Sequence, residues 1–160
     1  MGYYDDISEG YEELHREEQL KKVELIKRFL RVKPSDKLLD VGCGTGLTTE
    51  PWECQRFGID PAPKLIERAR QKEVIEYKIA PAEDIPYPDR YFEFVISVTA
   101  IQNFADIEKG LKEIKRVGKG RFILSVLKKS PNIDLITDLI NKNFKVKEVV
   151  EEARDIIFII

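Results

Sequence analysis

Apolar positions along the chain repeat with two periods, one helical and one typical of strands. After a polar lead-in over residues 1–10, apolar residues recur every three or four positions between residues 11 and 31, which predicts an amphipathic helix ended by Pro34. Short apolar runs predict strands over residues 37–41, 56–60, 74–80, 92–98, 121–127, 146–150 and 156–160. The helical period returns over residues 63–72, 105–117 and 133–143.

Strands that alternate with helices are typical of βαβ units, whose strands lie parallel in one sheet. The last two predicted strands leave no room for a helix between them, so we expect a hairpin with an antiparallel last strand. The prediction is an α/β fold with a mostly parallel, seven-stranded sheet and helices on both faces. Residues 1–160 have the length of one domain, with 1–31 as an N-terminal lid and helix and 37–160 as the core.

Composition excludes several classes of protein. Hydrophobic residues make up 42% and charged residues 35%, with a net charge of −2, so the chain is neither disordered nor a polycation. Two cysteines and one histidine argue against a structural metal and a disulfide framework. No signal peptide or membrane span is visible, so we expect a cytoplasmic protein that binds no membrane. The many charges beside eight Asn and Gln residues favour a thermophile as the source.

The candidate chemistry starts in a glycine-rich segment, Asp40-Val41-Gly42-Cys43-Gly44-Thr45-Gly46, which directly follows a predicted strand. Glycines there let the backbone turn close to a ligand. Asp60 follows Asp40 by 20 residues at the end of the next strand, where a carboxylate can accept both hydroxyls of a ribose. The third glycine comes one position early for a dinucleotide motif, and no Lys-Ser/Thr pair follows. An adenosine ligand without a pyrophosphate therefore fits best.

Several segments resemble the class I S-adenosylmethionine-dependent methyltransferases. Residues 38–46 resemble their motif I, residues 57–65 their second motif, and residues 82–87 the segment that holds the adenine. Residues 92–98 and 114–127 resemble the fourth strand and the late helix with the fifth strand, and the terminal hairpin matches the antiparallel last strand. The resemblance covers nearly the whole chain. It implies a Rossmann-like fold, S-adenosyl-L-methionine as cofactor and S-adenosyl-L-homocysteine as product.

The resemblance also implies a set of cofactor-binding residues. The glycines would pass under the methionine part and the sugar, Asp40 would hold the ammonium group, and Asp60 would take the ribose hydroxyls. The implied set is Tyr4, Tyr11, Asp40, Gly42, Cys43, Gly44, Gly46, Asp60, Pro61, Glu83, Asp84, Ile85 and Ser97. One departure from the family pattern is the short stretch between Gly46 and the second strand, which leaves room for about one helical turn.

Catalytic candidates follow the fourth strand, where acceptors bind in this family. They are Ser97, Thr99, Gln102 and Asn103, with Phe104 placed to stack on a base. A neutral nitrogen acceptor needs no strong general base, and the sequence shows no catalytic His or Cys dyad. Cys43 lies in the cofactor loop, which argues against a cysteine adduct.

The acceptor is the most open part of the prediction. The run 97–102 is similar to one in eukaryotic small-subunit rRNA guanine-N7 methyltransferases, and archaeal small-subunit rRNA cytosine-N4 methyltransferases are another compact possibility. Residues 108–129 hold eight basic residues against two acids, a net +6. We therefore expect a base nitrogen of ribosomal RNA as acceptor, with the ribosomal subunit bound through the basic segment 109–129 and an activator protein as a further candidate partner. The alternatives are a methyltransferase for a small molecule (a quinone precursor or an amine) and a non-catalytic cofactor-binding subunit.

Overall fold

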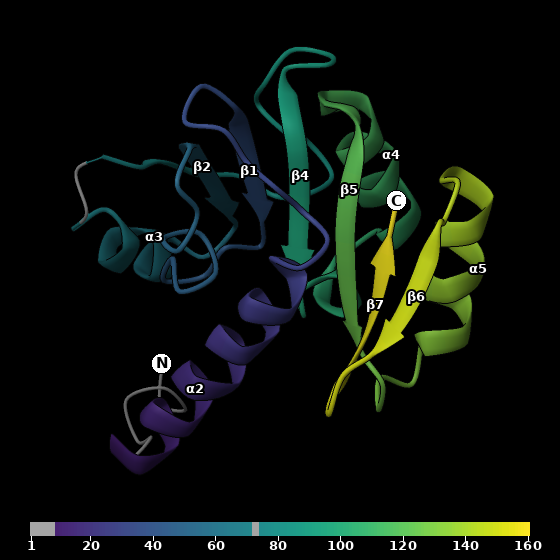
Figure 1. Cartoon of the computed structure of the whole chain (residues 1–160), viewed down its shortest axis with the longest axis horizontal. Coiled ribbons are helices and arrows are strands. Elements are labelled where there is room, and N and C mark those ends of the chain that lie inside the picture. Colours follow the sequence, from purple (N-terminus) through teal and green to yellow (C-terminus); the bar gives the residue numbers. More distant parts are fainter. Residues whose placement is uncertain (1–8, 72–73) are drawn as a thin grey trace.

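A computed structural model of the chain describes residues 9–71 and 74–160, which form one α/β layer structure (Figure 1). The described strands make a seven-stranded sheet in the order β3-β2-β1-β4-β5-β7-β6. The strands are β1 (Lys37–Val41), β2 (Gln55–Asp60), β3 (Glu76–Ile79), β4 (Phe92–Val98), β5 (Gly118–Leu127), β6 (Glu148–Glu151) and β7 (Asp155–Ile159). The helices are α2 (Glu9–Ile26), α3 (Pro63–Ala69), α4 (Ile107–Val117) and α5 (Ile133–Asn143), with the 3₁₀ turn η1 (Ile101–Asn103) after β4.

The strand directions confirm the predicted fold. β1, β2, β3, β4 and β5 pair in parallel, and β7 runs antiparallel to both β5 and β6. This is the Rossmann-like arrangement that the resemblance implies. The chain adds β2 and β3 on one side of β1 and then returns to place β4 on the other side. A crevice opens at such a switch point, beyond the carboxyl ends of the strands.

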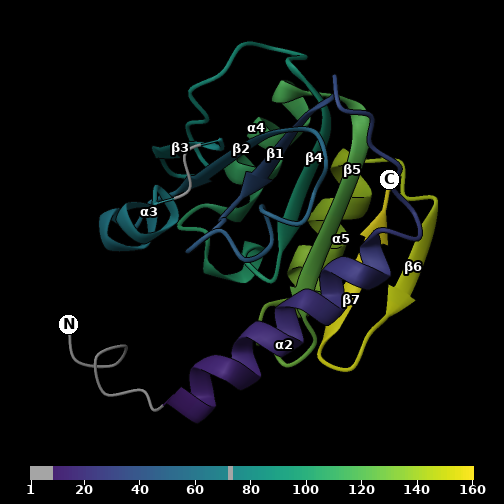
Figure 2. The same cartoon turned by 60° about the vertical axis from the view of Figure 1, so that its left-hand side comes forward.

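Helices cover both faces of the sheet, as predicted. α2 lies across one face, and α4 and α5 lie on the other (Figure 2). On the α2 side, Val23 and Ile26 are buried against sheet residues that include Leu38 and Ile96. On the other side, Ile114 and Ile140 belong to the larger apolar core. Burial of these apolar stripes is the main force that fixes the helices on the sheet.

Some element ends differ from the prediction. The first helix ends at Ile26 rather than near residue 31, because residues 27–29 already turn, with Phe29 N–H donating to the Ile26 carbonyl at 2.9 Å. α4 begins at Ile107, since the Asp106 carboxylate accepts the Lys109 N–H and caps the helix. β5 begins three residues early, at Gly118, where an irregularity follows its pairing with Phe92.

The short connection after Gly46 contains no helix of its own. The N–H groups of Thr49 and Glu50 both donate to the Gly46 carbonyl, which closes a compact turn. Trp52 stabilises this turn. Its side chain is buried, and Nε1 donates to the Thr48 carbonyl at 3.0 Å. The predicted departure from the family pattern is therefore confirmed. The glycine loop is therefore not followed by a full helix.

Candidate functional site

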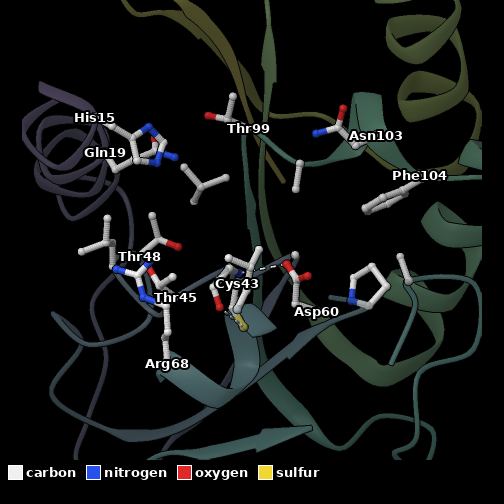
Figure 3. A pocket seen from close by; sticks show the side chains of 18 of the residues that line it. His15, Gln19, Cys43, Thr45, Thr48, Asp60, Arg68, Thr99, Asn103 and Phe104 are labelled. Carbon is white, nitrogen blue, oxygen red and sulfur yellow. Dashed lines mark hydrogen bonds between the residues drawn. The ribbon is translucent and has the colours of Figure 1, made fainter. Parts of the chain in front are cut away.

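A cleft of about 830 Å³ lies beyond the carboxyl ends of β1, β2 and β4, at the switch point of the sheet. The glycine loop forms its floor. Asp60 and Pro61 line it at the end of β2, residues 80–83 at the end of β3, and residues 98–100 and 103–105 at the end of β4. The N-terminal part of α2 closes the remaining side (Figure 3). Segments that are far apart in sequence therefore meet around one space.

The glycine loop turns through conformations that side chains rarely adopt. The φ angles are +77° at Gly42, +56° at Gly44 and +91° at Gly46. A Cβ at Gly42 would lie 2.5 Å from the Ala100 Cβ, and one at Gly46 would lie 2.4 Å from the Tyr77 hydroxyl oxygen. A Cβ at Gly44 would meet no described atom within 4 Å, so this residue faces open space. The loop packs closely at both ends and leaves its middle open to a ligand.

Asp60 joins the glycine loop to the end of β2. Its Oδ2 accepts the Gly44 N–H at 3.0 Å and its Oδ1 accepts the Ala62 N–H at 2.9 Å. The residue is only 8% exposed, yet it lines the cleft. Since each carboxylate oxygen can accept more than one hydrogen bond, both oxygens retain capacity for a pair of ligand hydroxyls.

Asp40 lies beneath the loop and is fully buried. Its Oδ2 accepts the hydroxyls of Thr48 and Thr49 at 2.6 and 2.8 Å, which ties the turn after Gly46 to the end of β1. Its Oδ1 is buried and has no hydrogen-bond partner among the described residues. Burial raises the pKa of Asp40 to about 6, more than the two threonine hydroxyls lower it.

The structure brings eight of the predicted site residues together on the cleft. These are Gly42, Cys43, Gly44, Asp60, Pro61, Glu83, Thr99 and Asn103. Burial raises the pKa of the Cys43 thiol, with the nearby Asp40 and Asp60 charges adding to the effect. The thiol is therefore held in its protonated form, which agrees with the prediction that Cys43 is no nucleophile.

Besides Asp40 and Gly46, which lie at the ends of the glycine segment, four predicted residues do not line the cleft. The Ser97 hydroxyl is fully buried and donates to the Val41 carbonyl at 2.8 Å, within the sheet. Gln102 turns its amide inward, with Nε2 donating to the Thr99 carbonyl at 2.9 Å. Asp84 is exposed, and Ile85 is buried with its N–H on the Glu113 carboxylate. Ser97, Asp84 and Ile85 were predicted from the family resemblance and Gln102 from its place after the fourth strand, neither of which fixes the direction in which a side chain points.

The remaining two predicted residues cannot be placed in the same way. Tyr4 lies outside the described residues. The backbone of Tyr11 belongs to α2, but its side chain lies outside what the structure describes. Their predicted contact with the cofactor, and the lid function of residues 1–31, stay predictions.

The sequence analysis did not predict the residues that line the cleft from α2 and α3. His15, Gln19 and Arg16 line it from α2, and Arg68 lines it from α3. The missed signal was Lys22, a charged residue that shares the helix face of the apolar Ile26. Its side chain is only 4% exposed, donates to the Thr99 hydroxyl at 3.0 Å and lies 3.3 Å from the Asp155 carboxylate. A buried charge in an apolar stripe indicates a specific partner across the interface.

The predicted basic segment does not form a surface around the cleft. None of its eight basic residues is among those that line the cleft in the described structure. Several of them pair with carboxylates from other parts of the chain. The pairs are Arg116 with Asp89, Lys119 with Glu93 and Lys128 with Glu151, at 2.8, 2.6 and 3.9 Å. These three carboxylates offset half of the net charge of +6 counted in the sequence.

The residues of the cleft fit S-adenosylmethionine. Asp60 offers two oxygens for ribose hydroxyls, and the open side of Gly44 admits a ligand against the backbone. The buried, unpartnered Oδ1 of Asp40 is an acceptor close to this loop that an ammonium group could satisfy. Within residues 9–71 and 74–160, no three His, Cys, Asp or Glu side chains gather to hold a metal ion. In the same residues, no helix has the length and apolar character that a membrane crossing requires.

Two curated proteins are similar to most of this chain. The uncharacterized protein MJ1252 of Methanocaldococcus jannaschii is 28% identical over 155 residues, which cover 95% of this chain and 61% of that protein. The ubiquinone/menaquinone biosynthesis C-methyltransferase UbiE of Geotalea daltonii is 30% identical over 140 residues, covering 76% of this chain and 60% of that protein. This chain thus spans about three fifths of the length of these relatives. UbiE carries the name of a small-molecule enzyme, and the expected likeness to ribosomal RNA methyltransferases is not supported.

Solved structures share the fold. A putative methyltransferase of Haloferax volcanii, in complex with the Trm112 methyltransferase activator, superposes with a TM-score of 0.65 at 22% identity, over 74% of this chain and 57% of that one. The model of the methyltransferase-domain family matches residues 39–124, which include the glycine loop, Asp60 and most of β5. These residues supply most of the cleft described above. The chain therefore belongs to the methyltransferase-domain family, whose methyl donor is S-adenosyl-L-methionine.

Proposed function

We propose that this chain transfers the methyl group of S-adenosylmethionine to a small molecule held in the same cleft. The observation that carries the proposal is the meeting of Gly44, Asp60 and Thr99 around one space of about 830 Å³. That volume lies within the range of small-molecule and cofactor sites. It accommodates a cofactor together with a compact acceptor, whereas an RNA surface needs an open approach.

Each wall has a part in this proposal. When bound, S-adenosylmethionine supplies an electrophilic methyl group on a sulfonium with a neutral leaving group. Asp60 would accept the ribose hydroxyls, and Pro61 and Glu83 would border the adenine. The loop from Gly42 to Gly44 would lie under the sugar and the methionine part. The protein then acts mainly by alignment and exclusion of water, which is where an in-line transfer gains most of its rate.

Three observations favour a small acceptor over ribosomal RNA. The run 97–102, which carried the likeness to the RNA enzymes, turns the side chains of Ser97 and Gln102 into the protein. Half of the net charge of the basic segment is offset by Asp89, Glu93 and Glu151. The named relative UbiE also acts, by its name, in quinone biosynthesis. An activator protein remains a candidate partner on the strength of the Haloferax complex.

Binding of the cofactor is the first test. Isothermal titration calorimetry with S-adenosylhomocysteine should give a one-to-one complex that Asp60→Ala weakens at least 100-fold. Asp138→Asn, an exposed change on α5, is the control and should bind as the wild type does. Equal affinity in the wild type and Asp60→Ala would refute the proposed site.

The acceptor class is the second test. The protein and tritiated S-adenosylmethionine are incubated in three separate reactions, which contain total RNA, intact ribosomal subunits or a small-molecule extract. The extract comes from cells that lack the protein. We expect label in the extract that disappears with Asp60→Ala. Label confined to ribosomal RNA would support ribosomal RNA as the acceptor and would overturn the small-molecule proposal.

A further inference from the structure

The charged residues that line the cleft are mostly acidic. Four carboxylates line it against two guanidinium groups, and these residues are Glu12, Glu13, Asp60 and Glu83, and Arg16 and Arg68. The methionine part of S-adenosylmethionine carries a carboxylate beside its ammonium group. Most of this lining repels such a carboxylate, so the ligand is best held where one of the two arginines neutralises it.

The turn after the glycine loop offers no helix N-terminus to an anion. In doubly wound folds, a helix often follows such a loop, and the N–H groups at the start of that helix bind the anion. In this chain, residues 47–54 contain no helix. The N–H groups of Thr49 and Glu50 instead donate to the Gly46 carbonyl. These two donors are used within the turn, so a carboxylate at this place needs a positive group from another element.

Arg68 brings a positive charge to this place from α3. It lies in the last turn of that helix, next to Ala69. A Cβ at Gly46 would lie 3.7 Å from the Ala69 Cβ, and Ala69 shares a buried apolar cluster with Cys43 of the glycine loop. The Arg68 side chain is exposed and points from α3 into the cleft, on the side of Thr48 (Figure 3). The packing of α3 therefore fixes Arg68 beside the turn that lacks a helix.

Arg68 is better placed than Arg16 to bind an anion. Glu12 and Glu13 lie four and three residues before Arg16 on α2, and residues at these spacings are neighbours on a helix. The residue four positions before Arg68 on α3 is Lys64, and no acid lies three positions before it. The Arg68 guanidinium has no hydrogen bond or ion pair within the part of the chain that the structure describes. Its donors are therefore open to a ligand.

We propose that Arg68 binds the carboxylate of S-adenosylmethionine, in place of the helix N-terminus that the turn after Gly46 lacks. This inference rests on the proposed function, because it uses the position given there to the methionine part of the cofactor. A guanidinium presents its N–H donors in a planar fork, and a carboxylate accepts two of them at once. Asp60 on the ribose and Arg68 on the carboxylate would hold the ligand on both sides of the sulfonium, which orients the methyl group for transfer.

Two ligands that differ only in the carboxylate test this contact. Isothermal titration calorimetry is carried out on the full chain with S-adenosylhomocysteine and with its decarboxylated analogue, 5′-deoxy-5′-(3-aminopropylthio)adenosine, which keeps the amine. We expect the wild type to prefer S-adenosylhomocysteine by roughly tenfold or more, since the analogue lacks the charge-assisted pair. Arg68→Gln should weaken S-adenosylhomocysteine by the same factor and change the affinity for the analogue less than twofold.

Two control variants separate Arg68 from a general effect of charge. Lys64→Gln removes a positive charge one turn earlier on α3, from an exposed residue that is not among those lining the cleft in the described structure. It should leave both affinities unchanged. Arg16→Gln removes the other guanidinium of the cleft and should leave the preference for the carboxylate intact. All three side chains are exposed, so circular dichroism should show the wild-type fold in each variant.

The outcomes separate this inference from the proposed function. The inference is overturned if the wild type binds both ligands equally, or if Arg68→Gln weakens both ligands equally or neither of them. It is also overturned if Arg16→Gln alone removes the preference for the carboxylate. Binding of neither ligand to the wild type would refute the proposed function itself.

Discussion

The two principal walls of the cleft are held in different ways. The glycine-loop wall is fixed by short-range bonds: Gly42 and Cys43 donate to the Ile59 carbonyl, and Asp60 binds Gly44 and Ala62. The α2 wall is fixed by a contact between distant parts of the chain, Lys22 with Thr99 and Asp155. The first wall is a property of two adjoining strands. The second exists only when the first helix, β4 and β7 have come together.

This difference suggests that the two walls bind different ligands. A wall made from main-chain groups and glycines suits a ligand that is always the same, because the backbone offers little to vary. A wall made from helix side chains can change by substitution without disturbing the sheet. We therefore expect the cofactor to depend on the first wall and the acceptor on the second.

Lys22→Met is the strongest test of the α2 wall. It leaves the fully buried Asp155 carboxylate without its counter-charge, which costs about 3–5 kcal/mol of unfolding free energy. Urea unfolding followed by circular dichroism measures this loss. The double variant Lys22→Met/Asp155→Leu should recover most of it. A single variant as stable as the wild type would contradict the buried ion pair.

Gly46→Ala and Gly44→Ala separate packing from ligand access in the glycine loop. At Gly46, the φ of +91° and the Tyr77 hydroxyl 2.4 Å away predict a loss of about 2–4 kcal/mol of stability. At Gly44, no described atom is near, so only about 1 kcal/mol is lost through its φ of +56°. The methyl group at Gly44 should instead lower the affinity for S-adenosylhomocysteine at least tenfold. Equal effects of the two variants on both quantities would contradict this separation.

The pKa of Asp40 predicts a pH dependence that belongs to the glycine-loop wall alone. Since burial raises this pKa from 3.8 to about 6, the folded protein binds the proton more tightly than the unfolded chain. Stability therefore falls as the pH rises from about 4 through 6, by about 2–3 kcal/mol from this group. The difference in unfolding free energy between the wild type and Asp40→Asn, measured from pH 4 to pH 7, should show this fall. A difference that is constant with pH would contradict the buried carboxyl.

Lys119→Ala should have the smallest effect, because it lies on neither wall. The change removes a half-exposed pair with Glu93 at 2.6 Å, which is worth less than about 1 kcal/mol of stability. The affinity for S-adenosylhomocysteine should not change. A large loss of methyl transfer to any acceptor would show that the basic segment takes part after all.

Local patterns in the sequence predict the sheet and the glycine-loop wall of the cleft. The alternating periods gave every strand and the antiparallel ending, and the spacing of Asp40 and Asp60 placed both carboxylates beside the glycine loop. These features are local, since a strand, its following turn and the next strand are adjacent in the chain. Periodicity and glycine positions carry such information directly.

Which side chains face the cleft depends on how distant segments pack in the folded protein. Ser97 and Gln102 bond to main-chain carbonyls inside the protein, and Asp84 is exposed to solvent. Three basic residues of the segment pair with carboxylates from outside it. His15 and Gln19 reach the cleft where α2 packs on the sheet, and at this packing contact Lys22 of the first helix pairs with Asp155 of the last strand. No local pattern encodes a pairing between the two ends of a chain, because it is set by how the folded layers come together.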